Sequence, residues 1–276
     1  MQPMPHEDHR AGEDRPPGEH ALRESPPRES APGDAPPGTH PLARLITDAS
    51  AGRFPAADGG WRRVPPWRPG LEGIIAFTGH AVLALAPDIA SERLIDLGVD
   101  GFGGAHDPRL ITALAGPDGW IDSLDVLMTG RGTGSAGGPG TGPGGSAGDL
   151  ADHRAARAGD RARLVDRPDL AAHHRALFAA RIRDRFRILG YPDPRRSALA
   201  IVSTGLAGLT ELSFELEPAR RGTGRGTALI RDALTAIPAG RLVVAAIAPG
   251  NAASFRAALA AGFSPIGSMQ LFRRAV

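Results

Sequence analysis

The 276-residue chain contains no cysteine and no lysine, so all 32 of its basic residues are arginines. Without cysteine there can be no disulfide, no thiolate metal ligand and no thiol nucleophile. Without lysine there is neither a Schiff base nor the lysine of a Walker loop. No run of 18 apolar residues predicts a transmembrane helix, and no apolar segment after Met1 resembles a secretory signal. We therefore expect a cytoplasmic protein with no membrane partner.

Two stretches of the chain are poor in apolar residues. Residues 1–41 carry ten prolines and four of the nine histidines, which predicts a disordered, proline-rich tail. Residues 130–148 hold ten glycines in nineteen positions and predict a flexible connector. We expect residues 42–129 and 149–276 to form the two halves of a folded body with a sizeable core. An alternative is that 42–129 is a degenerate first copy of the second half.

Charge is nearly balanced, because 32 basic residues face 30 acidic ones and the formal net charge is +2. The arginines are densest in residues 150–187, which hold ten of them against five aspartates. They are not regularly interleaved with the aromatic side chains that stack on nucleic-acid bases. We therefore expect a solvated basic face there and no nucleic-acid partner.

Apolar spacing and turn residues predict the order of helices and strands. Residues 241–248 form a near-continuous apolar run, which favours a central strand with a parallel neighbour. Residues 210–217 alternate apolar and acidic residues, which predicts a strand with one buried face and one exposed, acidic face. The other expected strands are 73–85 with a bend at Thr78-Gly79-His80, 120–128, 198–203 and 263–273, beside an edge segment at 61–67. The expected helices are 41–50, 88–97, 108–115, 227–237, 251–261 and 169–184, the last with Leu170, His174, Leu177 and Phe178 on its apolar face.

A glycine loop follows the 210–217 strand. After Pro218, the sequence Arg-Gly-Thr-Gly-Arg-Gly occupies 221–226 and leads directly into the 227–237 helix. Glycines let the backbone approach an anion closely, and the free N–H groups of a helix N-terminus point toward it. The glycine spacing differs from the dinucleotide-binding pattern, and no lysine is present for a Walker loop. The loop therefore predicts a phosphate-binding site of another kind.

Two segments resemble the GNAT superfamily of N-acetyltransferases. Residues 216–230, Leu-Glu-Pro-Ala-Arg-Arg-Gly-Thr-Gly-Arg-Gly-Thr-Ala-Leu-Ile, are similar to the central motif of that family, V-x-P-x-x-R-G-x-G-x-G-T-A-L-L. Asn251 and Ser254, followed by Gly262-Phe263, match its second motif, N-x-x-[AS]-x-x-x-[YF]-x-x-x-G-[FY]. The resemblance covers roughly residues 197–276, with the two motifs in family order.

The resemblance implies a fold and a cofactor. The fold would be α/β (α+β), with a mixed, mostly antiparallel central sheet that has a splayed parallel strand pair and is flanked by helices. Residues 71–128 fit this layout by element order alone, and the glycine connector and the arginine-rich helix depart from it. Acetyl-CoA would be the co-substrate, its pyrophosphate in the loop and its pantetheine arm beside the preceding strand, and no metal is implied. The implied cofactor-binding residues are Leu216, Arg221, Gly222, Thr223, Gly224, Arg225, Gly226, Thr227 and Asn251.

Acetyl transfer to an amine needs a base for the amine, a polarised thioester and a proton for the leaving thiolate. Many members of the family use a tyrosine as that acid, but the matching position here is Ala258 and the only tyrosine is Tyr191. Ser254, on the same face of the expected helix, is a candidate to hydrogen-bond the thiolate directly or through water. The alternative is that Ser254 is a capping residue of the helix. Candidate bases are Glu211, Glu215 and His80. The alternatives for these three are exposed strand carboxylates and a structural histidine.

Two functional hypotheses follow. In the first, the protein transfers acetyl directly from acetyl-CoA to a primary amine of a small molecule or protein, within a ternary complex. The absence of cysteine argues against a covalent intermediate. In the second, it is a non-catalytic acyl-CoA-binding or sensing module, which the missing tyrosine favours. Exposed edge strands would also suit a homodimer.

Overall fold

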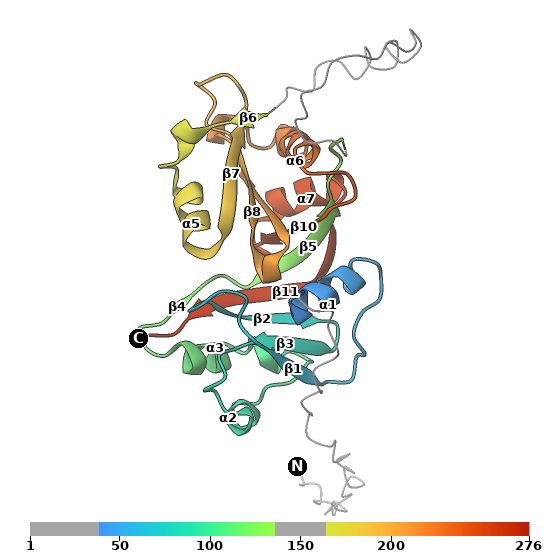
Figure 1. The fold of residues 1–276 in the computed structure, drawn as a ribbon, viewed down its shortest axis with the longest axis vertical. Helices are drawn as coiled ribbons and strands as arrows, with labels where there is room; N and C mark the ends of the chain where they lie inside the picture. The colour runs from blue at the N-terminus through green and yellow to red at the C-terminus, as the bar shows by residue number, and fades with distance from the viewer. Residues whose placement is uncertain (1–38, 136–163, 276) are drawn as a thin grey trace, which may run out of the picture.

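The computed structural model describes residues 39–135 and 164–275 (Figure 1). The expected tail, 1–41, and the expected connector, 130–148, lie mostly outside the described residues. Their described parts belong to regular structure, since Pro41 begins a helix.

The first residues of the glycine-rich stretch also belong to the folded body. Gly130 and Arg131 are the last residues of strand β5 (Asp125–Arg131), where they pair with the start of β10 (Leu242–Ile247). Gly134 forms an isolated bridge with Pro238. The expected boundary at residue 130 is therefore wrong, because the backbone of these residues pairs with a neighbouring strand instead of remaining solvated.

One mixed sheet of 11 strands connects both halves of the chain (Figure 1). In spatial order the strands are β1 (Trp61–Val64), β3 (His80–Ala84), β2 (Glu72–Phe77), β11 (Ser264–Arg273), β5, β10, β9 (Thr210–Glu215), β8 (Leu199–Thr204), β7 (Asp184–Gly190) and β6 (Val165–Asp166), while β4 (Trp120–Ile121) pairs with β11. The helices are α1 (Pro41–Ala49), α2 (Ser91–Asp96), α3 (Pro108–Ala115), α5 (His174–Ile182), α6 (Arg225–Thr235) and α7 (Ala252–Ala260), with short 3₁₀ turns at Gly104–His106, Pro168–Leu170, Leu206–Gly208 and Pro218–Arg220.

Strands β9 and β10 run parallel but separate early. Only Thr210 and Glu211 of β9 pair with β10, opposite Val243 and Val244. On its other edge β10 pairs with β5 in antiparallel register along its whole length. The expected mixed, mostly antiparallel sheet with a splayed parallel pair is therefore confirmed, as is the central position of β10. A second parallel pair, β1 with β3, was not expected.

The neighbour of β10 is supplied by the first half of the chain. Strand β5 lies between β10 and β11, and β11 continues the sheet to β2. The pairing of β11 with β5 has a register shift between Pro265 and Gly267, where a Cβ at Gly267 would collide with the carbonyl oxygen of Ala76. The two halves thus share one continuous sheet.

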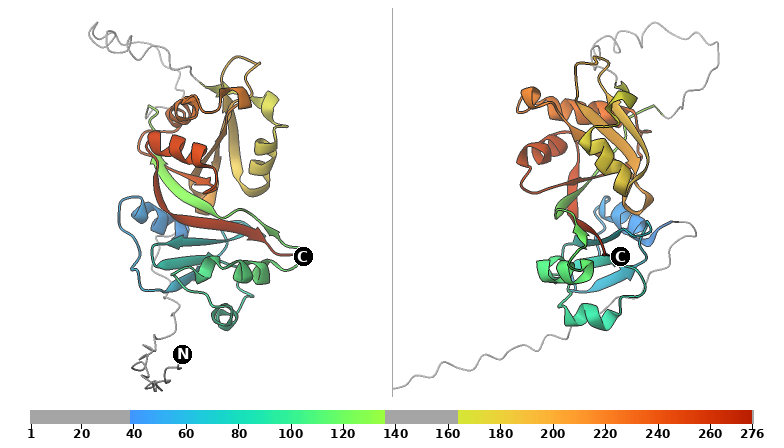
Figure 2. Two further views of the ribbon diagram at one scale, coloured as in Figure 1. Left: turned by 180° about the vertical axis from the view of Figure 1, so that it is seen from behind. Right: turned by 90° about the vertical axis from the view of Figure 1, so that its left-hand side faces the viewer.

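Helices cover both faces of the sheet (Figure 2). Around β8, the side chains of Leu199 and Ile201 pack with α5, whereas those of Ala198 and Ala200 belong to the core under α6. On α6, four apolar residues face inward as expected: Leu229, Ile230, Ala233 and Leu234. Helices α2 and α3 cover the β1–β3 region through a separate cluster around Trp61 and Phe272. No helix in the described part of the chain has the length and apolar character needed to cross a membrane.

Three expected elements need correction. Residues 73–85 form two strands, β2 and β3, because Gly79 has a φ of +70° and closes a two-residue hairpin turn rather than a bend. The 120–128 strand is interrupted by Asp122–Leu124, between β4 and β5. The 169–184 helix is shortened to α5, and Asp184 already belongs to β7.

The face of α5 that packs on the sheet also differs from the expected one. It buries the small side chains of Ala176 and Ala179 together with Ile182, whereas Leu177 is 55% exposed. Small residues permit a close approach of the helix to β7 and β8, and this approach outweighs the burial of the larger side chains.

Candidate active-site cleft

Two cavities meet where β9 and β10 diverge. The loop cavity, about 620 Å³, is bounded by the glycine loop, the end of β9 and helix α7. The inner cavity, about 600 Å³, lies between α5, β9, β10 and the residues joining β4 to β5. The residues that line both cavities are His174, Arg175, Phe214, Asn251 and Ser254. The cavities are therefore parts of one cleft.

The glycine loop forms the N-terminus of α6. Gly222 and Gly224 both have a φ of +76°, and Gly224 is the N-cap of the helix in the left-handed conformation. No atom lies within 4 Å of a Cβ built on either glycine, so backbone conformation rather than space requires glycine here. No side chain of the described residues caps this helix end, and Gly224, Gly226 and Thr227 at this end line the loop cavity, an arrangement compatible with an anion at the helix N-terminus.

Most of the expected cofactor residues line the loop cavity. They are Leu216, Arg221, Gly222, Gly224, Gly226, Thr227 and Asn251. The structure leaves Thr223 and Arg225 out of the lining. The Thr223 hydroxyl instead donates to the Arg220 carbonyl oxygen at 2.8 Å, inside the loop. Arg256, on α7, also lines this cavity, and sequence reasoning missed it although it lies five residues after the Asn251 cap.

Arg221 lies across the end of β9. Its Nε donates to the Leu216 carbonyl oxygen at 3.2 Å, and its Nη2 is 3.3 Å from Glu215 Oε1. The resemblance assigns this stretch of backbone to the pantetheine arm. Arg221 would therefore have to turn toward the loop when a pyrophosphate binds.

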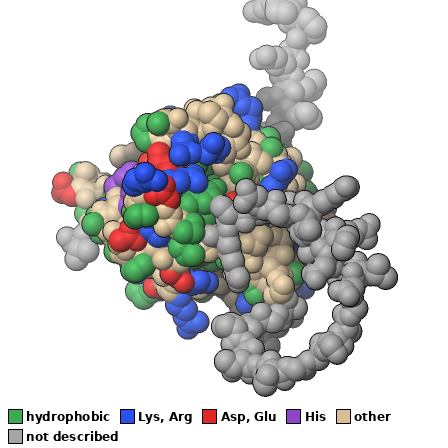
Figure 3. Space-filling view, turned by 90° about the horizontal axis from the view of Figure 1, so that it is seen from above, with side chains coloured by type: hydrophobic (Ala, Val, Ile, Leu, Met, Phe, Trp, Pro, Cys, Tyr) green, Lys and Arg blue, Asp and Glu red, His purple; other side chains and the backbone are tan. Residues whose placement is uncertain are grey.

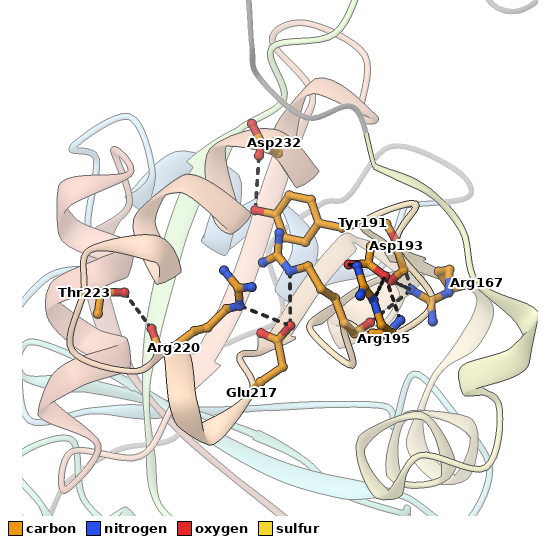
Figure 4. A network of polar contacts seen from close by, with 9 residues as sticks. Arg167, Tyr191, Asp193, Arg195, Glu217, Arg220, Thr223 and Asp232 are labelled. Atoms are coloured by element: carbon orange, nitrogen blue, oxygen red, sulfur yellow. Dashed lines mark hydrogen bonds and ion pairs between the residues drawn. The ribbon is translucent and has the colours of Figure 1, made fainter.

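A polar network supports the loop from below (Figure 4). Glu217 Oε1 accepts a hydrogen bond from Arg196 at 3.2 Å and lies 3.9 Å from Arg220 Nε. The Arg196 guanidinium stacks on the Tyr191 ring at 3.6 Å, and the Tyr191 hydroxyl donates to Asp232 of α6. Burial raises the pKa of the Tyr191 phenol. Tyr191 lines neither cavity, so its role is structural.

Glu211 is buried in the inner cavity rather than exposed on the strand. Its Oε1 is 2.6 Å from Arg183 Nη2, and its Oε2 accepts a hydrogen bond from the Leu206 N–H at 3.0 Å. Arg183 also donates to the Ser213 hydroxyl at 2.9 Å. The expected exposed acidic face of β9 is thus wrong at Glu211, because α5 and the residue that follows it cover this face.

Glu215 lies at the junction of the two cavities among cations. Its carboxylate is 3.1 Å from both His174 Nε2 and Arg175 Nε, and Arg221 approaches its other oxygen. Burial alone would raise the pKa of Glu215, but the hydrogen bond and charge of Arg175, with the nearby histidines, hold it below its usual value. Glu215 is therefore a weak base near neutral pH.

Asp122 and Asp125 are inner-cavity residues that sequence reasoning missed. Burial raises the pKa of Asp125 to about 6, with further contributions from Asp122 and Glu211, and the Ser123 hydroxyl donates to Asp125 at 2.8 Å. The pKa of Asp122 is also raised, chiefly by burial. Two aspartates interrupting an otherwise apolar run, Trp-Ile-Asp-Ser-Leu-Asp-Val-Leu-Met, were the available signal.

Ser254 lies in the first turn of α7, beside both cavities. Its backbone N–H donates to Asn251 Oδ1 at 3.1 Å, which confirms Asn251 as the cap of this helix. Within residues 39–135 and 164–275, the Ser254 hydroxyl has no hydrogen-bond partner and is free to meet a ligand. Ala258 is buried and offers no polar group at the position of the family tyrosine.

The structure does not bring His80 to the cleft. His80 begins β3, is buried, and its Nδ1 lies 3.1 Å from Asp58 Oδ1. It lines neither cavity. The structural alternative for His80 therefore fits its position.

Among the described residues, three side chains lie close enough together to be possible ligands of one metal ion. Donor atoms of His173, His174 and Glu215 lie within 4.8 Å of one another. However, His173 Nδ1 accepts the Arg175 backbone N–H at 3.2 Å, and Arg175 and Arg221 already contact both Glu215 oxygens. These contacts would compete with a cation.

The arginines of the described part of 150–187 are largely paired. Arg167 contacts Asp169 at 2.7 Å and Arg187 contacts Asp166 at 3.0 Å, in addition to the pairs of Arg175 and Arg183 described above. Seen from above, basic and acidic side chains lie next to one another on this face (Figure 3). The solvated basic face expected there is instead a face on which acidic side chains pair with several of the arginines.

In comparisons with known proteins, only solved structures resemble this chain. No protein-family model and no curated protein matches the chain. An acetyltransferase of the GNAT family from Novosphingobium aromaticivorans is 18% identical, over 58% of this chain and 69% of its own, with a TM-score of 0.35. An acetyltransferase of the GNAT family from Colwellia psychrerythraea is 12% identical, over 56% of this chain and 57% of its own, with a TM-score of 0.27. We base the function on this chain's own residues.

Proposed function

We propose that this protein is an acetyl-CoA-dependent N-acetyltransferase that transfers the acetyl group directly to a primary amine. The observation that carries the proposal is the single cleft at the splayed strands β9 and β10, with a helix N-terminus at one end and carboxylates at the other. An anionic cofactor and an amine could meet at the junction, beside Phe214 and Ser254.

The loop cavity suits coenzyme A. Its diphosphate would accept hydrogen bonds from the first N–H groups of α6, and Arg221 supplies a full positive charge beside them. Beyond Glu211, β9 has no partner on its β10 side, so its backbone is open to an extended, amide-containing arm. The pantetheine arm has this chemistry and would lead the thioester toward the inner cavity.

In the transfer step the amine nitrogen attacks the thioester carbonyl carbon, the C–N bond forms and the C–S bond breaks. The sulfur leaves as a thiolate and takes a proton to become the thiol of CoA. In this proposal the hydroxyl of Ser254, a residue that lines both cavities, delivers that proton directly or through water.

The test is acetyl-CoA binding by calorimetry. Arg221→Glu replaces attraction with repulsion at the diphosphate and should weaken binding by roughly 2 to 4 kcal/mol. Arg241→Glu, which makes the same charge change at an exposed position outside both cavities, should bind like the wild type. Equal affinities of all three proteins would refute the loop assignment.

A second candidate function, the binding of acyl-CoA without catalysis, is favoured by the alanine at position 258, where many GNAT members have the tyrosine acid. If acetyl-CoA binds in the cleft but no amine accelerates the release of CoA, the protein is an acyl-CoA-binding module rather than an enzyme.

A further inference from the structure

The inner cavity is lined by three carboxylates and three arginines, but only one of these carboxylates is in an ion pair within the described residues. Glu211 is paired with Arg183, and Arg175 and His174 at the junction contact Glu215. Asp122 and Asp125 form no ion pair within residues 39–135 and 164–275; the Asp122 carboxylate accepts the Ser123 N–H, and the Asp125 carboxylate accepts the Ser123 hydroxyl. Arg181, the remaining lining cation, is exposed, so water screens its charge.

Partial burial makes the unpaired charge of these two carboxylates unfavourable in free energy. Two ionised carboxyl groups in a partly desolvated cavity repel each other and Glu211, and the raised pKa values of both aspartates express that cost. The cost would be relieved by positive charge brought in with a ligand. Arg183, which also lines the cavity and is 8% exposed, is paired with Glu211 and forms no ion pair with the two aspartates.

Much of the remaining lining is apolar. It includes Leu177 and Phe178 of α5, Met269 and Leu271 of β11, and Phe214, which also lines the loop cavity. A volume of about 600 Å³ is in the range of small-molecule sites. The cavity thus combines a short apolar passage with two unpaired carboxylates.

We infer that the acceptor is a small aliphatic diamine that carries two positive charges, with Asp125 receiving the proton of the reacting ammonium and Asp122 pairing with the distal ammonium. This inference rests on the proposed function and specifies its substrate class. Its position on β5 places Asp125 beside the end of β10, where the cleft opens, since Val126 pairs with Ile247.

The proton transfers of the reaction explain why the acceptor needs two positive charges. The reacting ammonium gives one proton to Asp125, which becomes neutral, and the amine then attacks the thioester carbon. The second proton of that nitrogen passes to the departing thiolate, and Asp125 later releases its proton to water. In this scheme the distal ammonium stays paired with the Asp122 carboxylate throughout, which requires a second positive charge on the acceptor.

The experiment measures CoA release from acetyl-CoA by the full chain with 1,4-diaminobutane, n-butylamine and a basic peptide. We expect kcat/KM for the diamine to exceed that for the other two by about tenfold or more. Asp122→Asn should raise KM for the diamine and remove its advantage over n-butylamine. Asp125→Asn should lower kcat for both amines by about a hundredfold or more and abolish the rise of rate with pH near 6.

Asp96→Asn, at an exposed position on α2, is the matched control and should behave like the wild type. Calorimetry with acetyl-CoA verifies that each variant retains a folded cleft. Equal or better use of n-butylamine or the peptide, no turnover of the diamine despite acetyl-CoA binding, or an unchanged preference in Asp122→Asn would overturn the inference and leave the proposed cofactor site standing. Failure of the wild type to bind acetyl-CoA would instead overturn the proposed function.

Discussion

The loop cavity and the inner cavity are neighbours, but they are assembled in different ways. Half of the residues that line the loop cavity come from one continuous segment, 214–227, which includes the glycine loop at the N-terminus of α6. The carboxylates of the inner cavity and the arginine between them come from three separate segments, with Asp122 and Asp125 just before and at the start of β5, Arg183 after α5, and Glu211 on β9. Local sequence therefore specifies the first, whereas strand order specifies the second.

The largest expected effect is on stability and concerns the inner cavity. Glu211→Ala leaves the guanidinium of Arg183 buried without its partner and should lower the free energy of unfolding by about 3 to 5 kcal/mol. Urea denaturation measures the change, with Glu92→Ala on the exposed side of α2 as the control. A loss below about 1 kcal/mol would show that the Arg183–Glu211 pair does not hold this cavity together.

Gly224→Val should act on the loop cavity alone. Valine strongly disfavours a φ of +76°, so the N-cap of α6 would rearrange and acetyl-CoA affinity should fall by about a hundredfold. Gly240→Val is a matched control, because Gly240 has a φ of +77°, equally open surroundings and no place in either cavity. Calorimetry that finds equal affinity losses in both variants would contradict a direct role of the loop.

Ser254→Ala tests the junction of the two cavities. The variant keeps the backbone N–H that Asn251 caps but loses the free hydroxyl, so kcat should fall by about tenfold or more while acetyl-CoA affinity stays the same. Ser264→Ala, exposed on β11, serves as the control in the same CoA-release assay. An unchanged kcat would make water the proton donor.

Two carboxylates should show opposite dependence of stability on pH. The folded pKa of Asp125 is raised to about 6, so its contribution is present at low pH and lost as pH rises through 6. Asp125→Asn should therefore be more stable than the wild type at pH 7, by about 1 kcal/mol after allowance for solvent screening, with the difference disappearing near pH 4.

Glu215 has the opposite sign. Its folded pKa is lowered, so its contribution is present above the unfolded value and lost on acidification, and Glu215→Gln should be less stable than the wild type at pH 7. Thermal melting of both variants between pH 4 and 8 provides the comparison. Parallel pH profiles for the two variants would contradict the difference between the cavities.

The smallest effect is expected for Tyr191→Phe. Tyr191 supports the loop from outside both cavities, and the substitution removes one hydrogen bond to Asp232. We expect a stability loss of about 1 kcal/mol and kcat within about twofold of the wild type. A large loss of kcat in a stably folded Tyr191→Phe protein would mean that the phenol takes part in the reaction.

The helices, the hairpin β8–β9 and the apolar strand β10 could be predicted because their signals are local in sequence. The period of apolar residues, the caps and the turn glycines are all visible within short windows. The face of α5 could not be predicted, since the preference for Ala176 and Ala179 against the sheet depends on how closely the helix can approach. The hairpin at Gly79 was missed because an apolar run with one glycine is compatible with either a bend or a turn.

The sequence by itself determined the glycine loop at the N-terminus of α6, because glycine conformations and a helix N-terminus require only residues that are adjacent in the chain. Only the tertiary structure decided that β5 lies beside β10, and with it the placement of Asp125 in the cleft and of His80 outside it. Strand pairing between distant segments depends on the whole packed core rather than on any local pattern. The acceptor side of the cleft is therefore a property of the fold, and the cofactor side is a property of the motif.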